Sequence, residues 1–196
     1  MKKIAIYGGS FSPPQIGHGV VVETLQRLFP CDEIWVMPSA DRYDKKMTAS
    51  AEHRLKMLEV MIGELFPNPK VPIIVSPFEV QNLGLTTTYR TLMELNKLYP
   101  EDKFYLVVGS DIFYDIEPNW VEGKELFKSG NFVVIQRPGS FLPDKKGDNV
   151  HVLAGDVTTF DISSTFVREL LHHGHDGCPY ISRGVADYIR NNGLYI

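Results

Sequence analysis

Short apolar runs alternate with helix-like segments along most of this chain. The runs have the length and the β-branched or aromatic content of buried strands, and they lie at 4–7, 34–37, 73–75, 104–108, 132–135 and 150–153. The segments with helical periodicity are 18–28, 51–66, 88–99, 163–172 and 182–192. Because such alternation builds parallel sheets covered on both faces, it predicts an α/β fold: a Rossmann-like open parallel sheet with helices on both faces. No internal repeat or long linker divides the chain, so residues 1–196 are expected to form a single domain.

Composition and charge exclude several classes of function. The chain is 43% hydrophobic, enough for a full core, and its net charge of −4 is spread along its length. Nucleic-acid binding usually needs a basic face, so no nucleic-acid partner is expected. No apolar run approaches the roughly 20 residues of a membrane span, and Cys31 and Cys178 lie far apart without CxxC spacing. We therefore expect a soluble, cytoplasmic protein with reduced thiols, no membrane contact and no secretory leader.

The first candidate site lies where the first apolar run meets the first helical segment. Gly8 and Gly9 end the run, a proline-containing loop follows, and His18 stands where the helix begins. Glycines let a ligand approach the backbone, a helix N-terminus favours anions, and an imidazole there can donate to a phosphoryl oxygen as its charge grows. Neither common glycine-rich nucleotide-binding pattern is present, so an ordinary βα turn with a surface histidine is the alternative.

The second candidate site lies near the other end of the chain, at 161–168. Three consecutive hydroxyls, Ser163, Ser164 and Thr165, precede Arg168 at another expected helix start. A structural N-cap explains one hydroxyl and leaves the others and the arginine without a role. Hydroxyls, backbone N–H groups and a guanidinium together suit phosphate groups, so two such helix starts predict one shared polyphosphate.

These two segments resemble the paired motifs of the HxGH nucleotidyltransferase superfamily, GxFxPxHxGH and ISSTxxR. The similarity continues over nearly the whole chain in segments that resemble parts of the bacterial nicotinate-nucleotide adenylyltransferases, in order Met37-Pro38, His53-Arg54, Gly109-Ser110-Asp111, Pro118-Asn119-Trp120, Arg137-Pro138-Gly139 and 192–195. The resemblance implies an enzyme of NAD biosynthesis. Such an enzyme transfers AMP from ATP to nicotinate mononucleotide, or to its amide counterpart, and releases pyrophosphate.

The resemblance also implies roles for individual residues. It gives catalytic roles to His18, Arg168 and Gln15, and contacts with the pyridine mononucleotide to Thr88 and Trp120. The residues it places around ATP are Gly8, Gly9, Ser10, Phe11, Lys46, Gly109, Asp111, Arg137, Ser163, Ser164 and Thr165. Mg²⁺ is expected to arrive with ATP, without a metal site of the protein's own. The expected partners are these small-molecule substrates, and a homo-oligomer is left open.

Three positions depart from the family pattern. Gln15 replaces the first histidine of HxGH; its amide can donate a hydrogen bond but carries no charge, so weaker or redirected activity is expected. Lys45 or Lys46 stands where a PPHK-like stretch is common, with solvated lysines as the alternative, and Arg90 occupies a position that is often acidic. These departures leave two other hypotheses: a nucleotidyltransferase with another phosphomonoester acceptor, such as phosphopantetheine, and a non-catalytic nucleotide-binding protein.

Overall fold

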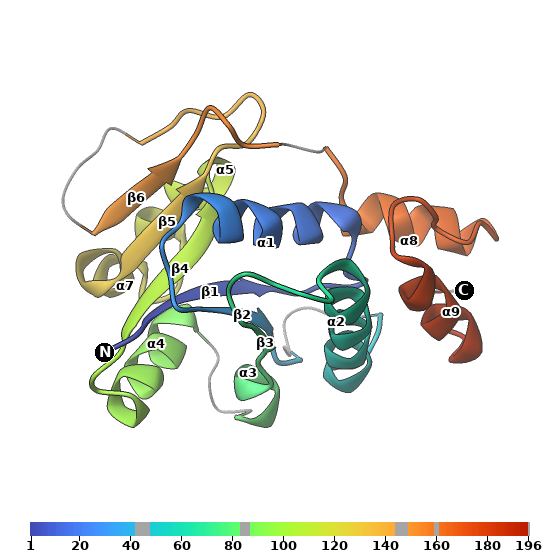
Figure 1. Ribbon diagram of the computed structural model, residues 1–196, viewed down its shortest axis with the longest axis horizontal. Helices are drawn as coiled ribbons and strands as arrows, with labels where there is room; N and C mark the ends of the chain where they lie inside the picture. The colour runs from blue at the N-terminus through green and yellow to red at the C-terminus, as the bar shows by residue number, and fades with distance from the viewer. Residues whose placement is uncertain (42–47, 83–86, 144–148, 159–160, 196) are drawn as a thin grey trace.

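The core of the protein is a six-stranded parallel sheet with the strand order β3-β2-β1-β4-β5-β6 (Figure 1). The computed structural model describes residues 1–41, 48–82, 87–143, 149–158 and 161–195. The strands are β1 (Lys3–Gly9), β2 (Glu33–Pro38), β3 (Ile73–Val75), β4 (Lys103–Gly109), β5 (Asn131–Ile135) and β6 (Val150–Leu153). All six predicted runs are strands, so the predicted α/β class and open parallel sheet are confirmed.

Nine helices lie within the described residues. They are α1 (Ile16–Leu28), α2 (Ala51–Leu65), α3 (Phe78–Gln81), α4 (Thr88–Leu98), α5 (Ser110–Phe113), α6 (Ile116–Asn119), α7 (Gly123–Ser129), α8 (Ser164–His172) and α9 (Arg183–Asn191). The five predicted helices are confirmed, whereas α3, α5, α6 and α7 were not predicted, because elements this short show no helical period. Hydroxyls of Ser50, Thr87 and Ser163 cap α2, α4 and α8. No helix in the described part of the chain is long and apolar enough to cross a membrane.

Both faces of the sheet are buried under helices, because successive strand residues point to opposite sides. On one face, Ala5 and Val36 pack with apolar side chains of α1, α2, α8 and α9. On the other face, Ile6 and Met37 pack with α4, α5, α6 and α7. In Figure 1, α8 and α9 lie beyond α2, near the start of α1. The last two helices of the chain therefore return to the loop that follows the first strand.

β1 and β4 are neighbours at the centre of the sheet, where the strand order reverses. From β1 the chain builds outward through β2 to β3, and from β4 it builds the other way through β5 to β6. In open α/β sheets, ligands bind outside the carboxyl ends of the strands at such a switch point. The loops after β1 and β4 therefore mark the place to look for a site.

Candidate active site

Two pockets open at the carboxyl ends of β1 and β4. The large pocket has a volume of about 290 Å³ and is lined by residues of β1, β2, α4 and β4. The small pocket, of about 40 Å³, is lined by residues of β1, α1, β4 and β5. Val107 and Val108 of β4 contribute to both linings. Two ligands bound here would meet at the switch point, as the transfer of a group between them needs.

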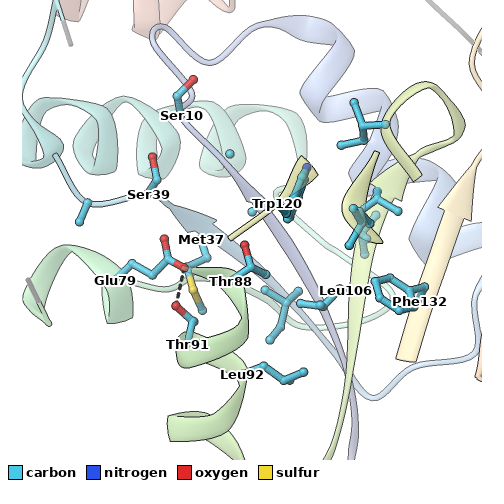
Figure 2. A pocket seen from close by; sticks show the side chains of 18 residues that line it. Ser10, Met37, Ser39, Glu79, Thr88, Thr91, Leu92, Leu106, Trp120 and Phe132 are labelled. Atoms are coloured by element: carbon cyan, nitrogen blue, oxygen red, sulfur yellow. Dashed lines mark hydrogen bonds between the residues drawn. The ribbon is translucent and has the colours of Figure 1, made fainter. Parts of the chain in front are cut away.

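Trp120 and Thr88 contribute to the large pocket from the end of α6 and the start of α4 (Figure 2). Trp120 is partly buried and adds an aromatic surface to the apolar side chains of the sheet. Glu79 supplies a carboxylate to the lining and accepts a hydrogen bond from Thr91 Oγ1 at 2.8 Å. Burial raises the pKa of Glu79, and the hydrogen bond from Thr91 opposes that rise. The pocket can take a flat ring against Trp120, with polar groups around it.

Asp111 and Arg137 lie close to Gly109 at the small pocket, whose lining includes Gly109 and Arg137. Arg137 Nε is 4.0 Å from Asp111 Oδ1, and Ser110 Oγ accepts the N–H of Arg137 at 2.9 Å. A Cβ at Gly109 would come within 2.1 Å of Asp111 Oδ1, so a larger residue there would displace this carboxylate. A carboxylate can accept from ribose hydroxyls, and a guanidinium can bind phosphate, so the pair suits a nucleotide.

His18 is held in one orientation at the first turn of α1. Its Nδ1 accepts a hydrogen bond from the backbone N–H of Gln15 at 2.9 Å, and the Phe11 ring packs edge-on at 4.9 Å between centroids. Burial and the nearby charge of Arg137 lower the pKa of His18 to about 3. The imidazole is therefore neutral at physiological pH, and its proton resides on Nε2 because Nδ1 is an acceptor. The fixed, neutral ring can therefore offer an N–H donor from Nε2, but no positive charge.

Gln15 is the N-cap of α1 and is only 3% exposed. Its Oε1 accepts from the N–H of Gly17, and its Nε2 donates to the carbonyl of Ile162 at 2.9 Å. Because Ile162 leads into α8, this side chain ties the two motif segments together. The contact of Gln15 with a triphosphate stays a prediction, and the contacts described here favour a structural role.

The start of α8 lies against the loop between β1 and α1. Arg168 Nη1 donates to the carbonyl of Ser12 at 2.6 Å, and Nη2 donates to Thr165 Oγ1 at 3.0 Å. Ser164 Oγ donates to the carbonyl of Pro13 at 2.9 Å. The two motif segments, distant in the sequence, are thus side by side on one loop. His18 and Arg168 both contact this loop, through the N–H of Gln15 and the carbonyl of Ser12.

Arg54 of α2 lies beside the site, and the family resemblance gave its segment, His53-Arg54, only a structural role. Its side chain is completely buried. Its guanidinium donates to four acceptors: the carbonyls of Ser10, Ser39 and Ala49 and the carboxylate of Asp41. An arginine within a helical pattern usually indicates an exposed position, and only the His53-Arg54 resemblance marked this one.

The predicted site residues do not share one pocket. Some line the large or the small pocket, and Thr165 and Arg168 line a third pocket of about 310 Å³. None of the three is lined by Gln15, His18, Asp111, Ser163 or Ser164. The large pocket gathers part of the expected ATP set with the expected mononucleotide contacts: Gly8, Gly9, Ser10, Thr88 and Trp120. The small pocket takes two others, Gly109 and Arg137. The Phe11 side chain is buried beside His18, where it supports the imidazole. Lys46 and its alternative Lys45 lie outside the described residues.

Comparison with known proteins identifies the family. The cytidylyltransferase-like family model matches residues 6–170. A protein of Oceanobacillus iheyensis, named as a probable nicotinate-nucleotide adenylyltransferase, is 32% identical over 196 residues, covering 100% of this chain and 97% of the relative. The chain belongs to the nicotinate-nucleotide adenylyltransferase family. A family member from Geobacillus thermodenitrificans, also named as probable, is 31% identical over 198 residues, covering 100% of this chain and 87% of its own.

Solved structures of the same family share the fold. The nicotinic acid mononucleotide adenylyltransferase of Plasmodium falciparum in complex with NaAD superposes with a TM-score of 0.82 at 29% identity, covering 100% of this chain and 98% of that one. The complex of that protein with APC gives a TM-score of 0.78 at 27% identity, with the same coverage. The resemblance read from the motifs is thereby confirmed, as is the expectation of an adenylyltransferase enzyme.

Proposed function

We propose that this protein transfers AMP from ATP to nicotinate mononucleotide, or to nicotinamide mononucleotide, in NAD biosynthesis. The observation that carries the proposal is the meeting of the two motif segments: Arg168 and Ser164 bind the β1–α1 loop between two pockets that share the end of β4. The NaAD complex of the Plasmodium relative supports the assignment. The mononucleotide would occupy the large pocket, with its ring on Trp120, and the adenosine of ATP the small one.

In this mechanism the acceptor phosphate is its own nucleophile. An oxygen of the mononucleotide 5′-phosphate attacks the α-phosphorus of ATP, a P–O bond forms, and the bond to the β-phosphate breaks with its electron pair leaving on pyrophosphate. Because the attacking oxygen already carries negative charge, no general base is needed. The protein contributes alignment of the two substrates and donors to the charged oxygens. His18 would donate from Nε2, and Arg168 would donate through N–H groups left over from its contacts with Ser12 and Thr165.

Magnesium enters this proposal as part of the substrate. Mg²⁺ prefers oxygen ligands, keeps several waters and is commonly bound through substrate phosphates. Within the described ranges no group of three or more His, Cys, Asp or Glu residues could hold a metal ion. We propose that the ion arrives bound to ATP, as part of the substrate. We further propose that residues 1–196 act as one cytoplasmic domain with small-molecule partners and no nucleic acid.

The test is an acceptor screen with the purified protein. ATP and Mg²⁺ are incubated with nicotinate mononucleotide, nicotinamide mononucleotide or phosphopantetheine, and both pyrophosphate and the adenylylated product are measured. Pyrophosphate with either pyridine mononucleotide supports the proposal, and the ratio of the two kcat/KM values decides between acid and amide. Turnover only with phosphopantetheine, or only with CTP in place of ATP, would reassign the acceptor or the donor. ATP binding without pyrophosphate release, whichever acceptor is offered, would identify a non-catalytic nucleotide-binding protein.

A further inference from the structure

Arg54 is a fully buried cation beneath the β1–α1 loop. It stands in the first turns of α2, and because helical side chains lean toward the helix N-terminus, its guanidinium reaches the loops that precede α2. Its hydrogen bonds are 2.8 Å from Nη1 to the carbonyl of Ser10, 2.7 Å from Nη2 to the carbonyl of Ser39, and 3.3 Å from Nε to that of Ala49. One side chain therefore joins the loop after β1, the end of β2 and the segment before α2.

The two shortest of these bonds determine how two peptide groups face the large pocket. In a trans peptide the C=O of one residue and the N–H of the next point in opposite directions. With the carbonyl of Ser10 turned inward to Arg54, the N–H of Phe11 faces the other way, and the same holds for the N–H of Ala40 after Ser39. Ser10, Ser39 and Ala40 all line the large pocket. No backbone carbonyl among the described residues accepts a hydrogen bond from the N–H of Phe11.

The energetics do not favour an arginine here for stability alone. Burying a charged group is costly unless it is paired, and well-packed apolar side chains often stabilise such a position equally well. The ionic partner of Arg54 is Asp41, at 2.9 Å, whose side chain is 51% exposed and shields the charge incompletely. What an apolar residue cannot supply is the set of donors that fixes three loop carbonyls at once.

We propose that Arg54 is a positioning residue for the adenylyl transfer. It fixes the peptide groups after Ser10 and Ser39 so that the N–H groups of Phe11 and Ala40 face the phosphates that react between the pockets. The inference rests on the proposed function. Arg54 itself lies too deep to touch a substrate, since its side chain has no exposed surface.

The test compares Arg54→Lys and Arg54→Met with the matched surface change Arg190→Lys. The Arg190 side chain is 70% exposed on α9, where it pairs with its helical neighbour Asp187. Lysine keeps the charge but cannot span three carbonyls. Because small misplacements of reacting groups cost about 100-fold in rate, folded Arg54→Lys is expected to lose about that factor in kcat with a much smaller change in KM for ATP. Arg190→Lys is expected to match the wild type.

A second measurement separates positioning from folding. Arg54→Ala leaves room for a free guanidinium ion, so millimolar guanidinium is expected to restore part of its kcat and to do nothing for His18→Ala. Folded Arg54→Lys and Arg54→Met proteins with wild-type kcat would overturn the proposal. So would variants that all fail to fold, since the residue would then be structural only.

An activity-independent readout keeps this inference distinct from the proposed function. The amide signal of Phe11 in NMR spectra is expected to shift when inorganic pyrophosphate is added to the wild type, and to shift far less in Arg54→Lys. A wild-type protein without pyrophosphate release would refute the proposed function, whereas an unmoved Phe11 amide would refute the role of Arg54.

Discussion

Two arginines donate to the same loop, and their surroundings differ. Arg54 lies beneath the β1–α1 loop, completely buried, and donates four hydrogen bonds that begin with the carbonyl of Ser10. Arg168 lies at the edge of the loop, only partly buried, and donates two, to the carbonyl of Ser12 and to Thr165. A guanidinium has five N–H groups. Arg54 therefore has little left to offer a ligand, whereas Arg168 retains several donors.

The number of donors left free therefore distinguishes two kinds of residue. The first kind holds the backbone of the site in place, and the second kind can contact the substrate. Gln15 belongs to the first kind, since both the Nε2 and the Oε1 of its amide are already hydrogen-bonded. We assign His18 to the second kind, because Nδ1 accepts from the N–H of Gln15 and no described residue is a hydrogen-bond partner of Nε2. The same chemical type, arginine, can belong to either group according to its burial.

The largest effect is expected from His18→Ala. Removing a preorganised donor to a developing charge typically costs about 10²- to 10³-fold in kcat, so turnover should fall far more than ATP affinity. His18→Asn, which retains an N–H donor, should recover part of the loss. Steady-state kinetics and calorimetry with an ATP analogue measure the two quantities, and equal losses in both would show that His18 only binds.

The pH profile tests whether His18 is neutral when it acts. Because burial holds the pKa of His18 at about 3, the imidazole is neutral from pH 6 to 8, and kcat/KM for ATP should show no loss there that belongs to His18. A cationic histidine would instead lose activity as pH rises through its usual value near 6.5. The difference between the wild-type and His18→Asn profiles isolates this contribution.

Arg168→Lys should have the next largest effect. Lysine keeps the charge, but it lacks the planar guanidinium that can donate to the loop and to a phosphate at the same time. We therefore expect kcat/KM for ATP to fall by about 10- to 100-fold. The melting temperature should change little, since the helix retains its cap and its buried face. A large loss of stability with unchanged kinetics in the folded protein would show that Arg168, like Arg54, holds the backbone and does not contact the substrate.

These same residues show how much of the fold and of the site could be predicted from the sequence. The strands were predictable because buried parallel strands are short apolar runs. The meeting of the two motif segments was predicted from two helix starts that both suit phosphate, and from the resemblance to the paired family motifs. The buried contacts of Arg54 were not predictable, because they depend on three loops that approach one helix only in the folded chain. Gln15 was similar: the sequence showed a missing positive charge, whereas its orientation is set by the carbonyl of Ile162, far along the chain.

Gln15→Ala should affect stability more than chemistry. Loss of the N-cap bond and of the partner of a partly buried carbonyl is expected to cost about 1–2 kcal/mol in the free energy of unfolding. The kcat of the folded protein should change by less than about threefold, a difference of under 1 kcal/mol. Denaturant titration and kinetics on one preparation test both statements. Gln15→His restores the histidine of the family pattern; a large gain in rate from it would show a degraded site and refute a purely structural role for Gln15.

The smallest effect is expected from Glu79→Gln. This variant tests whether the carboxylate that lines the large pocket lowers the stability of the protein when it is charged. Burial raises the pKa of Glu79 above its usual 4.5, so the folded protein binds this proton more tightly than the unfolded chain does, and wild-type stability falls as pH rises through that window. Glutamine can still accept from Thr91 and has no proton to lose. The two melting temperatures should therefore agree near pH 4 and separate by a few degrees toward pH 7, with the variant more stable. An equal difference in melting temperature at pH 4 and pH 7 would mean that the charge of the Glu79 carboxylate does not lower stability.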